Sequence, residues 1–294
     1  MRRRLRALAT TLTLALCGAL AGAATATATP QPSPDRATTP TSAARQAGVE
    51  RAGGAFMGWS AEGHGRAQAP GTAYRTLGGT KLTAEPLESS GVEGLDVSGW
   101  QGDVDWNSWW DQGKRFAYVK ATEGTGYTND HFTQQYNGSY DVGMIRGGYH
   151  FALPDASSGA AQADYFVDHG GGWSADGKTL PGVLDIEYNP YGATCYGLSQ
   201  AQMRDWVASF TSEYQALTGR DPVIYTNFDW WNTCTGDTTA FNQTNPLWVA
   251  RYSSSPGTLP GAWPFHTFWQ YTSSPLDLDR FNGSYDRLEA LALG

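Results

Sequence analysis

The sequence predicts an α/β protein built as a (β/α)8-type barrel, and three observations support this fold class. Eight short β-prone runs follow one another from Gly91 onward. Most are separated by about 20–35 residues, which is enough chain for a crossover between parallel strands. The alternative, an open doubly wound sheet, is disfavoured because no Gly-rich dinucleotide fingerprint is present. Eight such units in about 200 residues lie near the lower size limit of the barrel fold.

Each predicted strand is an apolar or aromatic run bounded by turn-forming residues. The runs are 94–98, 116–122, 145–151, 182–187, 222–227, 247–252, 266–272 and 276–278. Helices are expected at 129–142, 157–169 and 199–218. The last is the clearest, because Ser199 can cap its start and Gly219 can end it. Other connections look too short or too Gly-rich for a full helix.

The N-terminal region predicts export. Residues 1–28 combine a basic start, an Ala/Leu-rich run and a small-residue cleavage zone, which is typical of a secretory signal peptide. A membrane anchor is the alternative, but the run falls short of the roughly 20 apolar residues that a span needs. We therefore expect a secreted, extracellular protein with no membrane anchor after processing.

Residues 29–91 are predicted to be a disordered linker or pro-region preceding a catalytic barrel at 92–294. The first part is rich in Ala, Thr, Pro and Ser, which bury too little apolar surface to offset chain entropy. The rest is Gly-rich and weakly patterned. Within it, residues 56–59 could pack locally on the folded domain.

The charge of the chain limits its binding partners, and its cysteines predict one disulfide. The formal net charge is −8, and loss of the four leader arginines would bring it to about −12. This excess of acids, with no basic run after residue 6, argues against a nucleic-acid partner. Cys17 lies in the leader, so Cys195 and Cys234 remain, and in an exported protein they predict one disulfide. We expect a monomer.

Carboxylates follow predicted strands at informative places. Asp96 lies near the end of the first strand, and Asp185 and Glu187 end the fourth. Residues i and i+2 of a strand share a face, so these last two point the same way, with Cα atoms about 6.5 Å apart. Burial and mutual repulsion should raise the pKa of one of them, as a general acid for glycoside hydrolysis requires. A structural role as caps or ion-pair partners is the alternative, but active sites of this fold occupy this end of the barrel.

Aromatic residues are frequent near strand ends, and sugar rings stack on aromatic faces. The chain has 12 Trp, and Tyr149 and Tyr225 are the best candidates for the site because each lies near a strand's C-terminal end. Many of the others are expected to fill the core.

Other chemistries find little support. The five histidines form no recognisable metal pattern, so we expect no metal site and no cofactor. His150 is expected to be a hydrogen-bonded strand residue rather than a ligand. The sequence contains neither a nucleophile elbow nor a P-loop.

Seven segments together resemble family 25 glycoside hydrolases, the Chalaropsis-type lysozymes (N-acetylmuramidases) that include streptomycete enzymes. The match begins with Gly94-Leu95-Asp96-Val97-Ser98-Gly99-Trp100-Gln101-Gly102 and Val104-Asp105-Trp106 and covers about residues 92–294. The other segments are 118–124, 148–151, 184–187, 223–227, 247–250, and 269–271 with 277–279. Each is weak alone, but seven in order are specific.

The resemblance implies a flattened barrel with fewer helices than strands. It also implies hydrolysis of the β-1,4 bond between N-acetylmuramic acid and N-acetylglucosamine in the glycan strands of peptidoglycan. Glu187 would be the general acid, Asp185 would orient the N-acetyl group or act as second carboxylate, and Asp96 would assist. The groove would be lined by Lys120, Tyr127, Tyr149, Tyr225 and Trp248.

Asp277 would shape the site from the last strand. Asp279 stands where the family commonly has Asn, so either Asp277 or Asp279 could face the sugar.

Two mechanisms and two rival functions stay open. A protein carboxylate could act as nucleophile or base, or the substrate's acetamido oxygen could attack the anomeric carbon, which we favour. A chitinase-type barrel is the enzyme rival, although its longer signature needs acids where Leu180 and Val183 stand. A non-catalytic wall-binding barrel would be expected to lack a key carboxylate.

Overall fold

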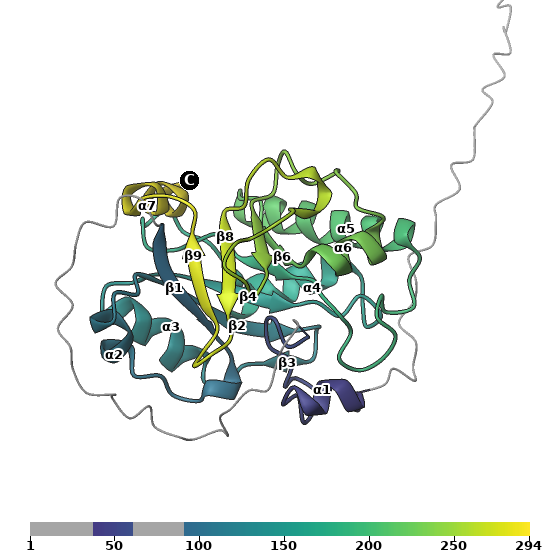
Figure 1. Ribbon diagram of the computed structural model, residues 1–294, viewed down its shortest axis with the longest axis horizontal. Coiled ribbons are helices and arrows are strands. Elements are labelled where there is room, and N and C mark those ends of the chain that lie inside the picture. The colour runs from purple at the N-terminus through teal and green to yellow at the C-terminus, as the bar shows by residue number, and fades with distance from the viewer. Residues whose placement is uncertain (1–37, 61–90) are drawn as a thin grey trace, which may run out of the picture.

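Eight strands close into a barrel in the computed structural model, which describes residues 38–60 and 91–294 (Figure 1). In sheet order they are β1 (Val92–Val97), β9 (Leu278–Phe281), β8 (Phe268–Thr272), β7 (Leu247–Ala250), β6 (Val223–Thr226), β5 (Val183–Asp185), β4 (Ile145–Phe151) and β2 (Phe116–Glu123). Pairing of β1 with β2 closes the ring, and the two-residue β3 (Tyr127–Thr128) adds to β2. The predicted signal peptide and residues 29–37 and 61–90 of the predicted linker lie outside the described residues.

The barrel strands run parallel from β1 to β8, and β9 runs antiparallel to both of its neighbours. The cause is the length of the connection before β9. Residues 273–277 are too few for the crossover that a parallel partner requires but are enough for a hairpin. The last strand therefore begins at Leu278, where the predicted run 276–278 ends.

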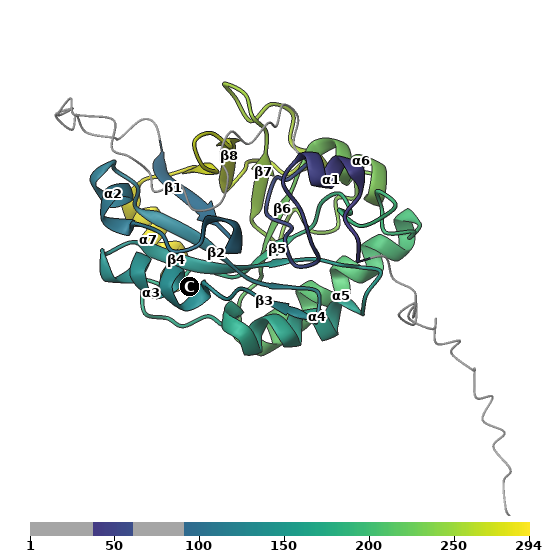
Figure 2. The same cartoon turned by 90° about the horizontal axis from the view of Figure 1, so that it is seen from below.

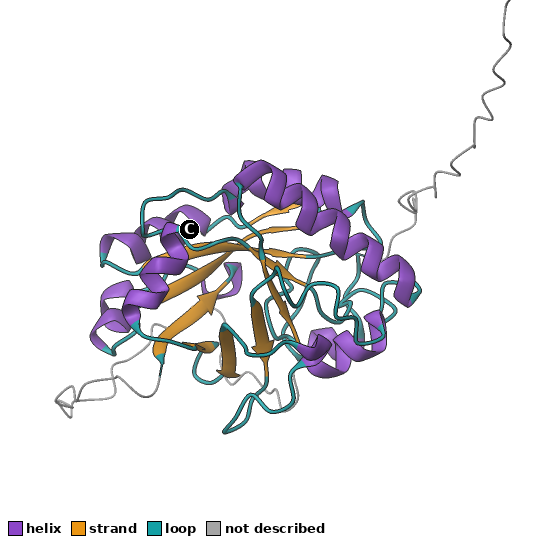
Figure 3. Ribbon diagram, turned by 90° about the horizontal axis from the view of Figure 1, so that it is seen from above, coloured by secondary structure: helices purple, strands orange, loops and turns teal. Residues whose placement is uncertain are grey.

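Helices surround the barrel on its outside (Figure 3). The three predicted helices are present as α3 (Phe132–Asp141), α4 (Gly159–Phe166) and α5 (Gln200–Thr218). Ser199 caps α5 through a capping box, and Gly219 ends it in the left-handed conformation. The prediction missed α2 (Trp106–Asp111), α6 (Phe228–Thr235) and α7 (Tyr285–Leu293), and there are three further short turns, η1 (Gly99–Gln101), η2 (Val167–Gly171) and η3 (Pro260–Ala262).

A barrel with fewer helices than strands is therefore confirmed, within the described part of the chain. Its interior is a filled core that runs from Met57 at one mouth to Leu288 and Ala292 of α7 at the other. A second apolar layer joins the barrel to α4, α5 and α6, and a third joins it to α2 and α3. Only the mouth at the carboxyl ends of the parallel strands can accommodate a site of this fold.

Residues 38–60, here called the N-terminal segment, lie across that mouth (Figure 2). They contain α1 (Ser42–Gln46), and the side chains of Val49, Phe56 and Trp59 are buried in the same cluster as barrel residues. The expectation of disorder is not met for these residues, because those apolar side chains have a surface to pack on. The expected packing of residues 56–59 on the domain is confirmed.

Cys195 and Cys234 form a disulfide with Cα atoms 5.3 Å apart, as predicted. The bridge ties the loop after β5 to α6. Among the residues that the structure describes, none belongs to a helix both long and apolar enough to span a bilayer.

Candidate active site

The carboxylates predicted to be functional meet at the covered mouth. Asp185 is the last residue of β5 and Glu187 lies two residues further on, while Asp96 is close to the end of β1. All three are buried, with Glu187 1% exposed. The parallel strands place their carboxyl ends at one edge, which is why acids distant in sequence come together.

Asp185 and Glu187 lie close enough for their charges to interact, and neither carboxyl oxygen of Asp185 has a hydrogen-bond partner among the described residues. Burial, followed by the charge of Glu187, holds the pKa of Asp185 well above its usual range. Burial also raises the pKa of Glu187 to about 8, against opposing hydrogen bonds from Ser60 and Gly58. Because the pKa of each carboxyl is raised, the pair retains a proton near neutral pH.

A second group of acids comes from β1 and β9. The amide of Asp96 donates to the carbonyl of Asp277 at 3.2 Å, while Asp279 pairs in register with Gly94, two residues deeper in the barrel. Asp277 is therefore level with Asp96 at the mouth, and its charge raises the pKa of Glu187. Asp279 lies below, and burial and then Asp277 hold its pKa well above the usual range.

Lys120 is fully buried and pairs with Glu123, with Nζ and Oε2 2.6 Å apart. The pairing depends on a bulge in β2, where the register with β4 shifts between Lys120 and Thr122. The extra residue brings positions i and i+3 to one side of the strand. Lys120 Nζ also lies 4.8 Å from the ring centroid of Tyr127, which is half-buried at the rim.

Two tyrosines face the same space from β4 and β6. The Tyr225 hydroxyl donates to Gln270 Oε1 at 2.7 Å, and Gln270 Nε2 in turn donates to Asp96 Oδ2 at 2.7 Å. The Tyr149 hydroxyl accepts the backbone N–H of Met57 at 3.4 Å. Desolvation holds the pKa of both phenols well above their usual range, so both are neutral.

Trp248 occupies a different place from the other predicted groove residues. It is fully buried, and its ring meets those of Tyr118, Tyr225 and Phe268 in the barrel interior. Its edge-to-face contact supports the Tyr225 ring from within the core.

His150 is a structural residue, as expected. Its Nδ1 lies 2.7 Å from the Thr122 hydroxyl and its Nε2 2.9 Å from Gln162 Oε1. Burial lowers its pKa to about 3, so the ring is neutral and joins β2 and β4 to α4.

Comparison with known proteins identifies the family. The description "Glycosyl hydrolases family 25" matches residues 95–278. The chain belongs to this family. It is therefore a glycoside hydrolase, and the family 25 resemblance of the sequence is confirmed.

Named relatives of this family 25 enzyme include Lysozyme M1 of Streptomyces globisporus, 50% identical over 78% of this chain and 84% of the relative. An N,O-diacetylmuramidase of Chalaropsis sp. is 50% identical over 69% of this chain and its own full length. Among solved structures, the lysozyme of Streptomyces coelicolor is 54% identical with a TM-score of 0.68, covering 70% of this chain and 99% of that one.

A groove of about 500 Å³ stays open beside the carboxylates of this family 25 enzyme. It is lined by residues after β5, β6 and β7, among them Tyr188, Phe228, Asp229, Arg251 and Tyr252. Ser60 forms its end next to Glu187. Aromatic faces beside charged and amide groups suit a ligand with both C–H faces and hydroxyls.

Reasoning from the sequence missed three residues that contact the site. Glu123 was hidden because its i+3 spacing from Lys120 is not a strand repeat, and only the bulge aligns the two. Gln270 lies within β8 and Tyr252 follows β7, but only their hydrogen bond to each other and their closeness to Gly58 show where their side chains point.

Proposed function

We propose that this family 25 enzyme is a secreted muramidase that hydrolyses the β-1,4 bond between N-acetylmuramic acid and N-acetylglucosamine in peptidoglycan. The names of its 50%-identical relatives, a lysozyme and N,O-diacetylmuramidases, support this substrate. The observation that carries the proposal is the burial of Asp185 and Glu187 together at the barrel mouth, with the pKa of Glu187 raised to about 8.

Glu187 would act as the general acid. With a pKa of about 8 it keeps its proton at neutral pH and can transfer it to the glycosidic oxygen as the bond breaks. Ser60 lines the open groove and donates to Glu187, so a sugar bound in that groove would lie near this proton.

Asp185 would hold the substrate's acetamido group, whose oxygen attacks the anomeric carbon in a substrate-assisted reaction. A carboxyl near the acid whose oxygens have no partner among the described residues suits this role, since it can accept the amide N–H and turn the carbonyl oxygen inward. Water then opens the cyclic intermediate formed by the acetamido oxygen, and the Glu187 carboxylate takes a proton from that water, which restores its acid form.

The remaining groups would shape the cleft. Asp96, held by Gln270, and Asp277 at the same level would face the sugar, which favours Asp277 over the deeper Asp279. Lys120, Tyr127, Tyr149 and Tyr225 would line the cleft, and Phe228 and Tyr252 would extend it along the groove.

We also propose the domain organisation expected from the sequence, with a signal peptide at 1–28 and a catalytic barrel at 92–294. The enzyme would act outside the cell as a monomer on glycan strands, without a membrane anchor.

The test is Glu187→Gln in the secreted chain, with Glu213→Gln on the outer helix α5 as the matched control. We expect Glu187→Gln to stay folded and lose nearly all lysis of purified walls, whereas Glu213→Gln keeps it. Mass analysis of the fragments should show muramic acid at the new reducing end. Turnover by Glu187→Gln at the unaltered rate would overturn the assignment.

Two further measurements separate the rivals. Preferential hydrolysis of soluble chitin oligomers over peptidoglycan would favour a chitinase-type enzyme. Wall binding without any cleavage would favour a non-catalytic barrel. NMR of the fresh product decides the mechanism, since an inverted anomer would exclude the substrate-assisted route.

A further inference from the structure

The N-terminal segment is fixed to the barrel as part of its folded core. Backbone N–H of Thr41 donates to the carbonyl of Pro190 at 2.9 Å, and the Trp59 indole donates to the carbonyl of Tyr188 at 3.1 Å. Phe56 and Trp59 are at most 5% exposed. Contacts at both ends define one path for the segment across the mouth.

That path ends on the proposed general acid. The N–H of Gly58 donates to Glu187 Oε1 at 2.7 Å, and the hydroxyl of Ser60 donates to Glu187 Oε2 at 2.9 Å. Both carboxyl oxygens are therefore occupied by the chain's own residues. Met57, the residue before Gly58, is fully buried in the core of the barrel and donates its N–H to the Tyr149 hydroxyl.

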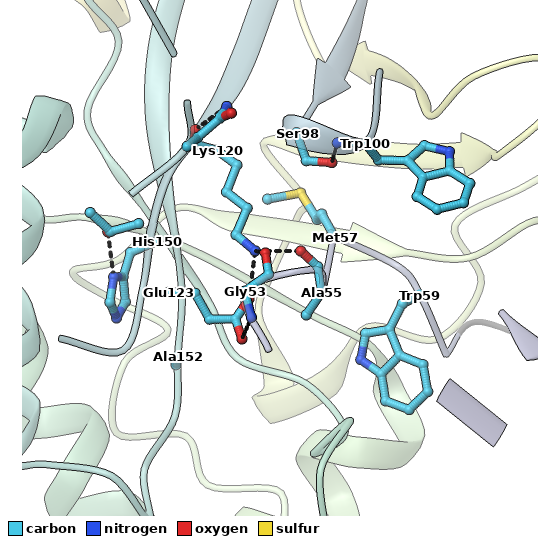
Figure 4. A network of polar contacts seen from close by, with 12 residues as sticks. Gly53, Ala55, Met57, Trp59, Ser98, Trp100, Lys120, Glu123, His150 and Ala152 are labelled. Atoms are coloured by element: carbon cyan, nitrogen blue, oxygen red, sulfur yellow. Dashed lines mark hydrogen bonds and ion pairs between the residues drawn. The ribbon is translucent and has the colours of Figure 1, made fainter. Parts of the chain in front are cut away.

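The segment also satisfies the buried cation of the site (Figure 4). Lys120 Nζ donates to the carbonyl of Gly53 at 3.1 Å and to that of Ala55. The N–H of Gly53 donates to Glu123 Oε1 at 3.2 Å. Backbone groups of the segment thus take the positions that polar groups of a saccharide would need.

Two glycines allow this close approach. Gly58 has φ of +74°, and a Cβ there would lie less than 3.0 Å from polar atoms of Tyr252, Gln270 and Tyr225. Gly53 has φ of +78°, and its Cβ would meet the ring of Tyr127 at a similar separation. Any side chain at either position is strained and collides with the barrel.

The contacts also oppose the acid chemistry. Donors to both oxygens of Glu187 stabilise its ionised form, and they lower its pKa against the effect of burial. The bound segment therefore occupies the position of the sugar and lowers the pKa of the acid, although burial still keeps that pKa at about 8.

We propose that residues 38–60 are a built-in inhibitory ligand of the catalytic cleft, and that the enzyme is latent until they are displaced. The proposal rests on the proposed role of Glu187 as the catalytic acid. Cutting the chain between Ser60 and Val92 would leave the segment held by noncovalent contacts alone, and the loss of tethering favours its release. Three solved structures of muramidases and a lysozyme, at 51–56% identity, are each covered over 99% of their length by about 70% of this chain. The barrel at 92–294 makes up a similar share of the chain.

The test compares full-length chains in release of dye from labelled walls. Gly58→Ala and Gly53→Ala should each raise the rate at least ~10-fold, because a cleft open in under a tenth of molecules limits the rate by that fraction. Gln46→Ala, on the exposed face of α1, is the matched control and should leave the rate unchanged. Equal rates for an active unaltered chain and both glycine variants would overturn the proposal.

A synthetic peptide of residues 38–60 gives an independent check. It should inhibit the Gly58→Ala chain, and the same peptide carrying Gly58→Ala should not. Inhibition by both peptides to the same extent, or by neither, contradicts a specific fit.

Co-sedimentation with purified walls separates the two proposals without requiring turnover. If no chain hydrolyses walls but Gly58→Ala binds them at least ~10-fold more tightly than the unaltered chain, the proposed function fails and the inhibitory segment stands. If wall binding and hydrolysis are both the same in all variants, the segment does not block the cleft.

Discussion

Lys120 and Glu123 form an ion pair of 2.6 Å although they lie three residues apart on one strand, a spacing that normally places side chains on opposite faces. The bulge in β2 adds one residue between them, so both side chains point to the same side of the strand. It thereby supplies a buried cation at the barrel mouth together with the anion that makes its burial tolerable.

We expect Lys120→Met to destabilise the protein by about 3 kcal/mol, because it leaves the buried Glu123 carboxylate without its cation. Urea unfolding of the purified chain measures the loss. The double variant Lys120→Met/Glu123→Gln should recover most of it, since no uncompensated charge remains. Identical midpoints for the single and double variants would show that the unpaired Glu123 charge is not the cause of the loss.

Asp185→Asn and Asp96→Asn should each lower kcat/KM on walls by at least ~10²-fold, the size expected when a positioned acid or electrostatic group is removed. Burial of both side chains makes a folding control necessary. Circular dichroism and the thermal midpoint provide it, and Asp168→Asn on the outer surface is the matched substitution. Near-unaltered turnover by folded Asp185→Asn would remove it from the mechanism.

The rate should fall as the pH rises through about 8, where Glu187 loses the proton that it must donate. Asp277→Asn removes a negative charge that raises the pKa of Glu187, so its alkaline fall should begin at lower pH. The measurement is the pH profile of kcat/KM, each variant normalised to its own maximum. A shift of the Asp277→Asn profile to higher pH would contradict this coupling.

Replacing both Cys195 and Cys234 by Ser should lower the free energy of unfolding by roughly 3–4 kcal/mol, because the bridge restrains a loop of 39 residues in the unfolded chain. Thermal unfolding measures the effect. In the unaltered protein neither thiol should react with a labelling reagent until a reductant is added. Labelling of both without reductant would refute the bridge.

Most of the strands and the gathering of the acids at one end of the barrel were predictable because both depend on local sequence. Apolar alternation predicted both ends of β4 correctly. The Asp-x-Glu spacing predicted that Asp185 and Glu187 lie close together, and their charges do interact. The role of residues 38–60 was not predictable in the same way. Their composition is that of a linker, and they are ordered only because the barrel offers Val49, Phe56 and Trp59 a place to pack.

The direction of the last strand also escaped prediction, because direction depends on the length of a connection rather than on periodicity. The apolar signal near residues 276–278 identified a strand but placed it too early. Likewise, helix α2 has only six residues, too few for a periodic pattern to show.

The reversed β9 gives the cleft one wall that does not follow the usual rule for barrels. Seven strands deliver their final residues to the mouth, whereas β9 delivers its first, so Asp277 is carried by the hairpin that leads into it. Changes in the length of that hairpin can move Asp277 relative to the acids of β5 while the hydrogen-bonded ladders stay intact. The segment 273–277 is thus a natural place for evolution, or an engineer, to retune substrate preference without rebuilding the scaffold.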